Sequence, residues 1–388
     1  MINRIAYKKI QYALENFPAV TILGARQIGK STIAKAIAID YPDSVYLDLE
    51  DASDIDKLAD AQGFLEKNSN RLVIIDEIQR MPQLYTALRP SIDKHRVPGR
   101  FLILGSASPL LVKGVSETLA GRVRFIDLDP VNLTEATQYG ISQDLNWFRG
   151  GFPVALTATS DEWMQDWIDD FISTYIERDL RWLFGRDFSR NVMRNFWGMT
   201  AHNNGSIWNA SNYSRSLGVS SPTVKSYAEL LEAGFLIRLL PAWYVNAGKR
   251  LVKSPKLYWR DTGLLHRMCR IGRFEDLFGH PVVGGSWEGY VIEQVVQHKN
   301  RDLDMYFYRT QNGAECDIVL VKGIKPVACI EIKLSNSPNI TEGYFNCIAD
   351  LKTKQNFIIT PFSDTYPYFG ATVCNLKAFL NDFLPTIG

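Results

Sequence analysis

The chain has 388 residues, of which 46% are hydrophobic, and a formal net charge of +1. A nearly neutral chain has no overall field that attracts nucleic acid or a membrane surface, so any such contact requires a local patch. The five cysteines are odd in number and form no Cys-x-x-Cys pair, which indicates reduced thiols and not a disulfide framework or a zinc site. Because no apolar run is long enough to span a bilayer, we expect a cytoplasmic protein with no membrane partner.

Short apolar runs alternate with helical patterns over the first 130 residues. We expect strands at 19–23, 44–49, 72–75 and 101–104, and a helix that begins at Ser31. Strands that alternate with helices predict βαβ units and a parallel sheet.

A glycine-rich loop follows the first of these strands. Residues 24–31 read Gly-Ala-Arg-Gln-Ile-Gly-Lys-Ser and match G-x-x-x-x-G-K-[ST] at every fixed position. Glycines let backbone N–H groups approach phosphates, the lysine reaches the β- and γ-phosphates, and the serine hydroxyl binds Mg²⁺. The loop and the start of the helix therefore predict ATP contacts from Gly24, Ala25, Arg26, Gln27, Ile28, Gly29, Lys30, Ser31 and Thr32.

Two acids end the third predicted strand, at Asp76 and Glu77. In such a sheet Asp76 is expected to hold a water on Mg²⁺, and Glu77 to polarise the attacking water. Ser106, after the fourth strand, is a candidate sensor of the γ-phosphate, although a plain turn serine is an equal alternative. Arg122 is a candidate arginine finger for a neighbouring subunit, or an ordinary surface arginine.

The middle of the chain becomes helical from residue 131. Residues 217–227 have the rhythm of a helix-turn-helix, with Gly218 at the turn and Ser221 as the expected N-cap. Thr223, Lys225 and Ser226 are expected to face outward, and strands at 235–240 and 256–259 resemble a wing. Eight basic residues between Lys249 and Arg273 suit phosphate contact, which predicts double-stranded DNA as a partner. The alternative is a packing module with a solvated basic face.

Carboxylates gather near the C-terminal end. Asp317 lies in the predicted strand 316–321, and Glu331 and Lys333 share one face of the predicted strand 327–332. A hairpin would place the three together, where two carboxylates can hold Mg²⁺ or Mn²⁺ and a lysine can activate water. Glu288, on the apolar face of an earlier helix, is the candidate further ligand. Glu293 is the fallback, expected to face solvent.

These motifs together resemble a bacterial and archaeal family of AAA-type P-loop ATPases with a winged helix and a C-terminal restriction-endonuclease-like domain. The resemblance rests on residues 24–32, 76–79, 105–108, 119–122, 150–153 and 175–179, and on Asp317 with 331–333. It implies an α/β fold: an AAA-like ATPase domain (1–130), a helical lid (131–188), a winged helix (189–268) and a nuclease-like domain (269–388). Ala25 departs from the family pattern, which usually has proline there. Arg178 becomes a second candidate arginine finger, with a structural ion pair as the alternative.

Two hypotheses follow. In the first, Mg²⁺-dependent ATP hydrolysis is coupled to DNA binding, with metal-dependent cleavage by Asp317, Glu331 and Lys333. In the second, the chain is an ATP-dependent switch whose nuclease-like domain only docks partners. AAA-like sites are often completed across subunits, so a homo-oligomer is compatible with either.

Overall fold

The computed structural model of the chain describes residues 2–106, 121–180, 188–244 and 251–388. These residues form two compact units. Unit 1 comprises Met1–Val131, Ser173–Phe188 and Glu229–Leu236, and unit 2 comprises Asn132–Ile172, Ser189–Ala228 and Ile237–Gly388. Four consecutive domains were predicted along the chain, whereas each unit draws on segments that lie apart in the sequence.

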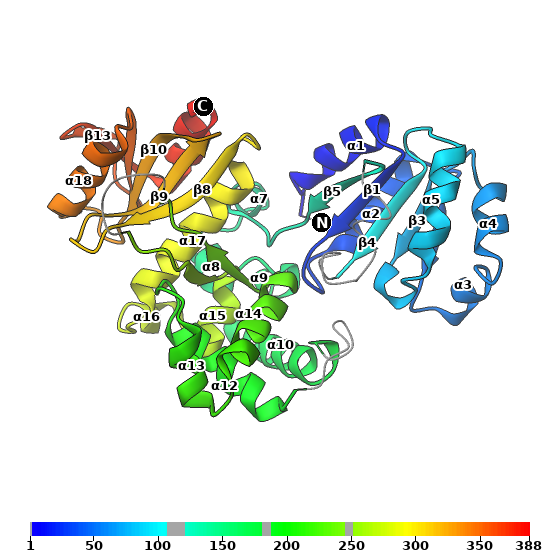
Figure 1. Cartoon of the computed structure of the whole chain (residues 1–388), viewed down its shortest axis with the longest axis horizontal. Coiled ribbons are helices and arrows are strands. Elements are labelled where there is room, and N and C mark those ends of the chain that lie inside the picture. The colour runs from blue at the N-terminus through cyan, green and yellow to red at the C-terminus, as the bar shows by residue number, and fades with distance from the viewer. Residues whose placement is uncertain (1, 107–120, 181–187, 245–250) are drawn as a thin grey trace. The chain divides into compact units, whose positions relative to one another are not determined.

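A five-stranded parallel sheet forms the centre of unit 1, in the order β2-β3-β4-β1-β5 (Figure 1). The strands are β1 (Ala19–Leu23), β2 (Val45–Asp48), β3 (Val73–Asp76), β4 (Phe101–Gly105) and β5 (Val123–Asp127). The first four agree with the predicted strands to within one residue at each end. The fifth was not predicted, because it is an edge strand whose side chains are mostly exposed and lack an apolar pattern.

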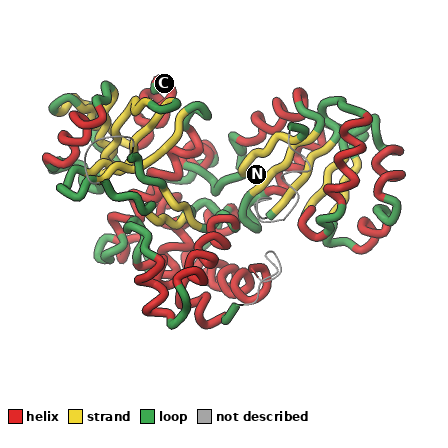
Figure 2. Tube along the Cα trace, in the orientation of Figure 1, coloured by secondary structure: helices red, strands yellow, loops and turns green. Residues whose placement is uncertain are grey.

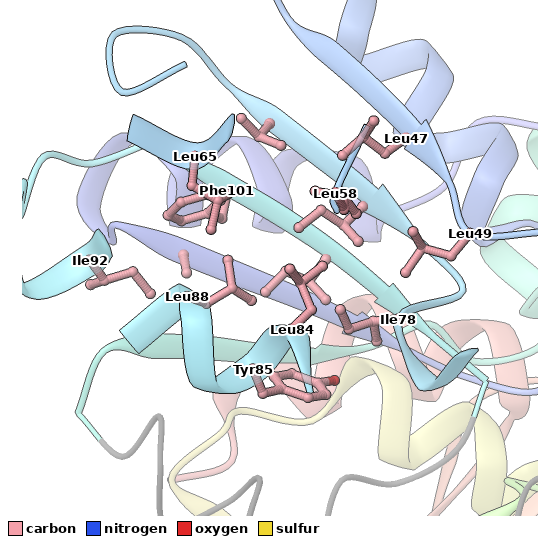
Figure 3. Close-up of a cluster of buried hydrophobic side chains, with 14 residues drawn as sticks. Leu47, Leu49, Leu58, Leu65, Ile78, Leu84, Tyr85, Leu88, Ile92 and Phe101 are labelled. Atoms are coloured by element: carbon pink, nitrogen blue, oxygen red, sulfur yellow. The ribbon is translucent and has the colours of Figure 1, made fainter. Parts of the chain in front are cut away.

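Helices cover both faces of this sheet. They are α1 (Ala6–Asn16), α2 (Lys30–Asp40), α3 (Ala52–Asp56), α4 (Ala61–Lys67) and α5 (Leu84–Lys94), and a 3₁₀ turn, η1, spans Ile78–Arg80. Leu84, Leu88 and Ile92 recur every four residues on α5 and pack into the core shown in Figure 3. The same core holds residues of β3 and β4, so it fixes the strand ends that carry the candidate site.

Unit 2 begins with a run of helices. They are α7 (Leu133–Gln138), α8 (Gln143–Arg149), α9 (Pro153–Leu156), α10 (Asp161–Thr174), α12 (Arg190–His202), α13 (Ala210–Leu217), α14 (Ser221–Ala233), α15 (Thr262–Met268) and α16 (Phe274–Leu277). The ends of α10 and α14 continue into unit 1, and a π turn, Tyr175–Asp179, follows α10 there.

The predicted turn between two helices lies between α13 and α14. Gly218 follows α13 in the left-handed conformation, with φ of 67°. The N-cap prediction was wrong by one residue: the backbone N–H of Thr223 donates to the Ser220 side chain at 3.2 Å, so Ser220 rather than Ser221 caps α14. Two antiparallel strands follow, β6 (Ile237–Leu240) and β7 (Lys256–Trp259).

A mixed six-stranded sheet forms the rest of unit 2, in the order β12-β13-β11-β10-β9-β8. Its strands are drawn in yellow in Figure 2. Its strands are β8 (Leu303–Arg309), β9 (Glu315–Lys322), β10 (Lys325–Ile332), β11 (Gln355–Thr360), β12 (Tyr366–Tyr368) and β13 (Ala371–Asn375). Helices α17 (Val283–His298) and α18 (Glu342–Leu351) contact the sheet, and α19 (Leu376–Ala378) with short turns at Phe379–Phe383 and Leu384–Thr386 ends the chain. β9 and β10 form the expected antiparallel hairpin, in which Ile330 pairs with Ile318.

Within the described ranges, no helix has the length and apolar character needed to cross a membrane.

Candidate functional site

The glycine-rich loop connects β1 to α2 in unit 1. Gly29 and Gln27 have φ of 102° and 62°, so the loop turns through the left-handed region twice. A Cβ on Gly24 would lie 2.4 Å from the carbonyl oxygen of Leu128, so only glycine fits there. No side chain caps the start of α2. Its first backbone N–H groups therefore remain suited to an anion.

Lys30 begins α2, and its side chain folds back into the loop. Its Nζ donates to the carbonyl oxygens of Gly24 and Ala25 at 3.0 and 2.9 Å. Burial lowers the pKa of Lys30 to about 8, although the nearby Glu77 and Asp76 oppose that shift. The hydrogen bonds of the Lys30 ammonium go to neutral carbonyl groups, so the nearby acids compensate the buried charge only in part. The ammonium is suited to receive a phosphate.

Asp76 ends β3 and faces the start of α2. The hydroxyl of Tyr46 donates to Asp76 Oδ2 at 2.6 Å. The same hydroxyl is hydrogen-bonded to the side chain of Ser31, and burial raises its pKa above the ordinary value. The two oxygen ligands predicted for Mg²⁺, on Ser31 and Asp76, are thus bridged by one tyrosine hydroxyl. Hard oxygen donors in this arrangement fit magnesium.

Glu77 adopts a left-handed backbone conformation, with φ of 56°. Such a conformation costs about 1–3 kcal/mol outside glycine and is frequent at functional sites. The Ser106 hydroxyl lies 3.2 Å from both carboxylate oxygens of Glu77, and Gln79 also hydrogen-bonds this carboxylate. Burial raises the pKa of Glu77, while the Lys30 charge opposes that shift. The structure therefore brings Glu77 and Ser106 together.

Arg26, within the loop, lies in an acidic network. It forms an ion pair with Asp179 of the Tyr175–Asp179 turn and another with Glu50 at 3.1 Å. Arg80 shares Glu50 at 2.6 Å. The charge of Arg26 is balanced by these acids.

The remaining predicted residues of unit 1 differ in exposure. Ala25 and Ile28 are buried, whereas Gln27 and Thr32 are exposed. Arg122 forms an ion pair with Asp93, at 2.6 Å from Nε to Oδ1. The side chain of Arg178 lies outside the described residues.

Among the six described members of the basic run of the middle region, four are held in ion pairs. Of its members, Lys249 and Arg250 lie outside the described residues. Ion pairs hold Lys256, Arg260, Arg267 and Arg273. On α14, Lys225 is exposed, while Thr223 and Ser226 are half-buried.

The C-terminal carboxylates converge in unit 2. Asp317 on β9 accepts from the backbone N–H of Ile332 at 2.9 Å, which places it beside Glu331 on β10. Lys333 Nζ lies 2.8 Å from Glu331 Oε1. Glu288, on α17, joins them through Lys256, whose Nζ lies 2.9 Å from Glu288 and 3.4 Å from Asp317.

Electrostatics in this cluster favour protonation of two acids. Burial raises the pKa of Glu288 to about 7 and that of Glu331 to about 8, and the charge of Asp317 adds to both shifts. Burial lowers the pKa of Lys256, but Glu288 and its neighbours outweigh this effect and raise it. Among the described residues, no group of three or more His, Cys, Asp or Glu side chains is arranged to hold a metal ion.

The prediction that Glu293 faces solvent was wrong. Its side chain is only 4% exposed and forms ion pairs with Arg238 and Arg260, the latter at 3.2 Å. These charges lower the pKa of Glu293 despite its burial. Glu293 is a buried structural acid.

Several site residues were not predicted, namely Tyr46, Gln79, Lys256, Tyr258 and Glu315. Lys256 had been assigned to a basic patch, yet it contacts Glu315 at 3.2 Å. The Tyr258 hydroxyl donates to Glu288. Residues two apart on a strand share a face, so Tyr258 lies on the same face as Lys256, and Glu315 on the same face as Asp317. Nothing local to residues 256–259 indicates their carboxylate partners.

Three family models match consecutive segments of the chain. Residues 16–137 match the family model described as an AAA domain, and residues 142–275 and 283–379 match two domains of unknown function, DUF8612 and DUF4143. The chain is 38% identical over 365 residues to Uncharacterized protein Rv2008c of Mycobacterium tuberculosis and to Uncharacterized protein Mb2031c of Mycobacterium bovis. Each match covers 94% of this chain and 81% of the relative. Among solved structures, it is similar to the Walker-type ATPase PABY2304 of Pyrococcus abyssi, with 13% identity, a TM-score of 0.49, and coverage of 69% of this chain and 96% of that one.

Proposed function

Because this chain belongs to the family of AAA-domain proteins that includes the two mycobacterial relatives, we propose that unit 1 binds ATP with Mg²⁺ and hydrolyses it. One observation carries the proposal. The buried ammonium of Lys30 is held by loop carbonyls, while Asp76 and Glu77 project from the end of β3 close enough to influence its pKa. A cation and two acids at the carboxyl ends of parallel strands suit phosphoryl transfer to water.

The loop residues bind and orient the triphosphate. The N–H groups of the loop and of the first turn of α2 face the phosphates, and Lys30 exchanges its carbonyl partners for phosphate oxygens. Ser31 and Asp76 would hold Mg²⁺, which neutralises phosphate charge when bound. The Tyr46 hydroxyl, which is hydrogen-bonded to both side chains, holds their oxygens close together.

Glu77 accepts a proton from the attacking water in this proposal. Ser106 and Gln79 hold its carboxylate, and the strained backbone fixes its direction. A general base contributes about 10²–10⁴ in rate. Ser106 therefore positions the base.

The test is ATP hydrolysis by the full chain, compared among wild type, Glu77→Gln, Lys30→Ala and the surface control Glu66→Gln. We expect Glu77→Gln to lower kcat by about 10²–10⁴ while ATP still binds. Lys30→Ala is expected to lose ATP binding. Glu66→Gln is the matched control, since it removes an exposed carboxylate whose partners are Lys94 and His95. Hydrolysis that survives Glu77→Gln unchanged contradicts the assignment of the base.

A second candidate is an ATP-dependent switch whose C-terminal carboxylates are not catalytic. It is favoured by Lys256, which lies among those carboxylates. We do not extend the proposal to DNA, because four basic residues of the candidate patch are already in ion pairs. Adding double-stranded DNA to the hydrolysis assay tests this choice. Stimulation of ATP hydrolysis that weakens as salt is raised would favour the DNA-coupled hypothesis instead.

A further inference from the structure

The β6–β7 hairpin contributes Lys256 to the carboxylate cluster, beside Tyr258, whose hydroxyl donates to Glu288. Its Nζ lies 2.9 Å from Glu288, 3.2 Å from Glu315 and 3.4 Å from Asp317. The Lys256 side chain is 4% exposed. The ammonium thus contacts acids from α17 and β9.

The cluster holds more acid than cation. Four carboxylates, those of Glu288, Glu315, Asp317 and Glu331, accompany the two ammonium groups of Lys256 and Lys333. Glu331 is 6% exposed, and its Oε2 is buried without a hydrogen-bond partner. Buried carboxylate oxygens are ordinarily paired, so this atom indicates a position suited to a cation or a proton.

The backbone of Lys256 is fixed from two sides. It pairs with Leu240 in the hairpin and with Ile207 in an isolated bridge. The hairpin in turn bridges to the large sheet, where Ala242 pairs with Phe307. The ammonium therefore cannot leave the carboxylates by a shift of the β7 strand alone.

We propose that Lys256 is the resident cation of this cluster and keeps divalent metal out of it. A metal ion bound to Glu288 and Asp317 would lie about 2.0–2.6 Å from their oxygens, which is the space that the ammonium occupies. Two cations in one buried site repel each other strongly. The cluster in the wild-type chain is then closed to Mg²⁺ and Mn²⁺, and the β6–β7 hairpin is what closes it. This inference does not depend on ATP hydrolysis by unit 1.

The test is Mn²⁺ binding to the full chain without nucleotide. Electron paramagnetic resonance of the free ion measures how much Mn²⁺ is bound. We compare wild type, Lys256→Met, Asp317→Asn, the double variant Lys256→Met/Asp317→Asn and the exposed control Lys253→Met. Lys256→Met is expected to bind about one Mn²⁺ per chain more than wild type, because the carboxylates around position 256 then lack the lysine ammonium. The double variant is expected to lose that ion, and Lys253→Met to bind as wild type does.

Thermal unfolding provides the second measurement. Lys256→Met leaves buried carboxylates without their cation, so we expect a lower Tm that Mn²⁺ partly restores. The Tm of wild type without nucleotide is expected to be the same with Mn²⁺ as without it.

Either of two results overturns the proposal. One is Mn²⁺ binding by wild type that disappears in Asp317→Asn, because the metal would then displace the lysine. The other is a folded Lys256→Met that gains no Mn²⁺. If Lys256→Met does not fold, the comparison of wild type with Asp317→Asn still decides: no Asp317-dependent Mn²⁺ supports the proposal.

Discussion

Replacing Glu293 by glutamine is expected to destabilise unit 2 strongly. Glu293 is 4% exposed on α17 and pairs with Arg238 of β6 at 3.0 Å and with Arg260 at 3.2 Å. Removing one partner from a buried ion pair costs about 3–5 kcal/mol, because the remaining charge stays buried without compensation. The amide oxygen of glutamine still accepts one hydrogen bond, so we expect a loss near 3 kcal/mol. For a unit of this size that corresponds to a Tm lower by about 6–12 °C.

Tryptophan fluorescence measures this loss directly, since all eight tryptophans that the structure describes lie in unit 2. Asp302→Asn is the matched control: its pair with Arg301, at 3.5 Å, is exposed and should contribute about 1 kcal/mol or less. Adding Arg238→Met to Glu293→Gln should recover part of the loss, because one of the two charges that paired with Glu293 is then gone. A loss below about 1 kcal/mol for Glu293→Gln would refute the reasoning, since it would mean that the three charges are hydrated.

Two further predictions concern Ser106 and His266. Ser106→Ala removes the hydroxyl that lies 3.2 Å from Glu77. A hydrogen bond to a charged group contributes about 1.5–3 kcal/mol, so kcat for ATP hydrolysis should fall by about tenfold or more with KM nearly unchanged. An unchanged kcat would show that Ser106 does not position the base. Burial lowers the pKa of His266 to about 4, from an ordinary value near 6.5. The unfolded chain therefore takes up the proton first, and the stability from His266, present above pH 6.5, is lost as pH falls toward 4. Between pH 7 and 4.5, urea unfolding should show that wild type loses about 2 kcal/mol more stability than His266→Gln; equal losses would contradict the shift.

The phosphate-binding loop could be predicted from the sequence because its residues are contiguous. Gly24 to Ser31 specify their own turn, and the strand before Asp76 is recognisable as a buried apolar run. The β9–β10 hairpin was similarly predictable, since alternation along each strand fixes which side chains share a face. Asp317, Glu331 and Lys333 therefore came together as expected.

The two acids of α17 show where local pattern fails. Glu288 and Glu293 are five positions apart, so they lie about 140° apart around the helix. The apolar pattern of this helix predicts a single buried face. Glu288 lies on that face, so Glu293 was predicted to face solvent. The structure buries nearly the whole of α17 from Ser286 to Val295. Both acids are therefore internal, and each has a basic partner from the β6–β7 hairpin.

The sequence by itself determined the elements whose residues are neighbours along the chain: the loop, the strands β1 to β4 and the carboxylate hairpin. Only the tertiary structure decided which charges meet. Lys256 contacts acids that lie 32 to 61 residues away, and Arg26 meets Asp179 across 153 residues. Such pairs depend on how separate elements pack, because a charged side chain carries no local mark of its distant partner. That packing placed Lys256, which the sequence assigned to a basic patch, among the carboxylates of unit 2.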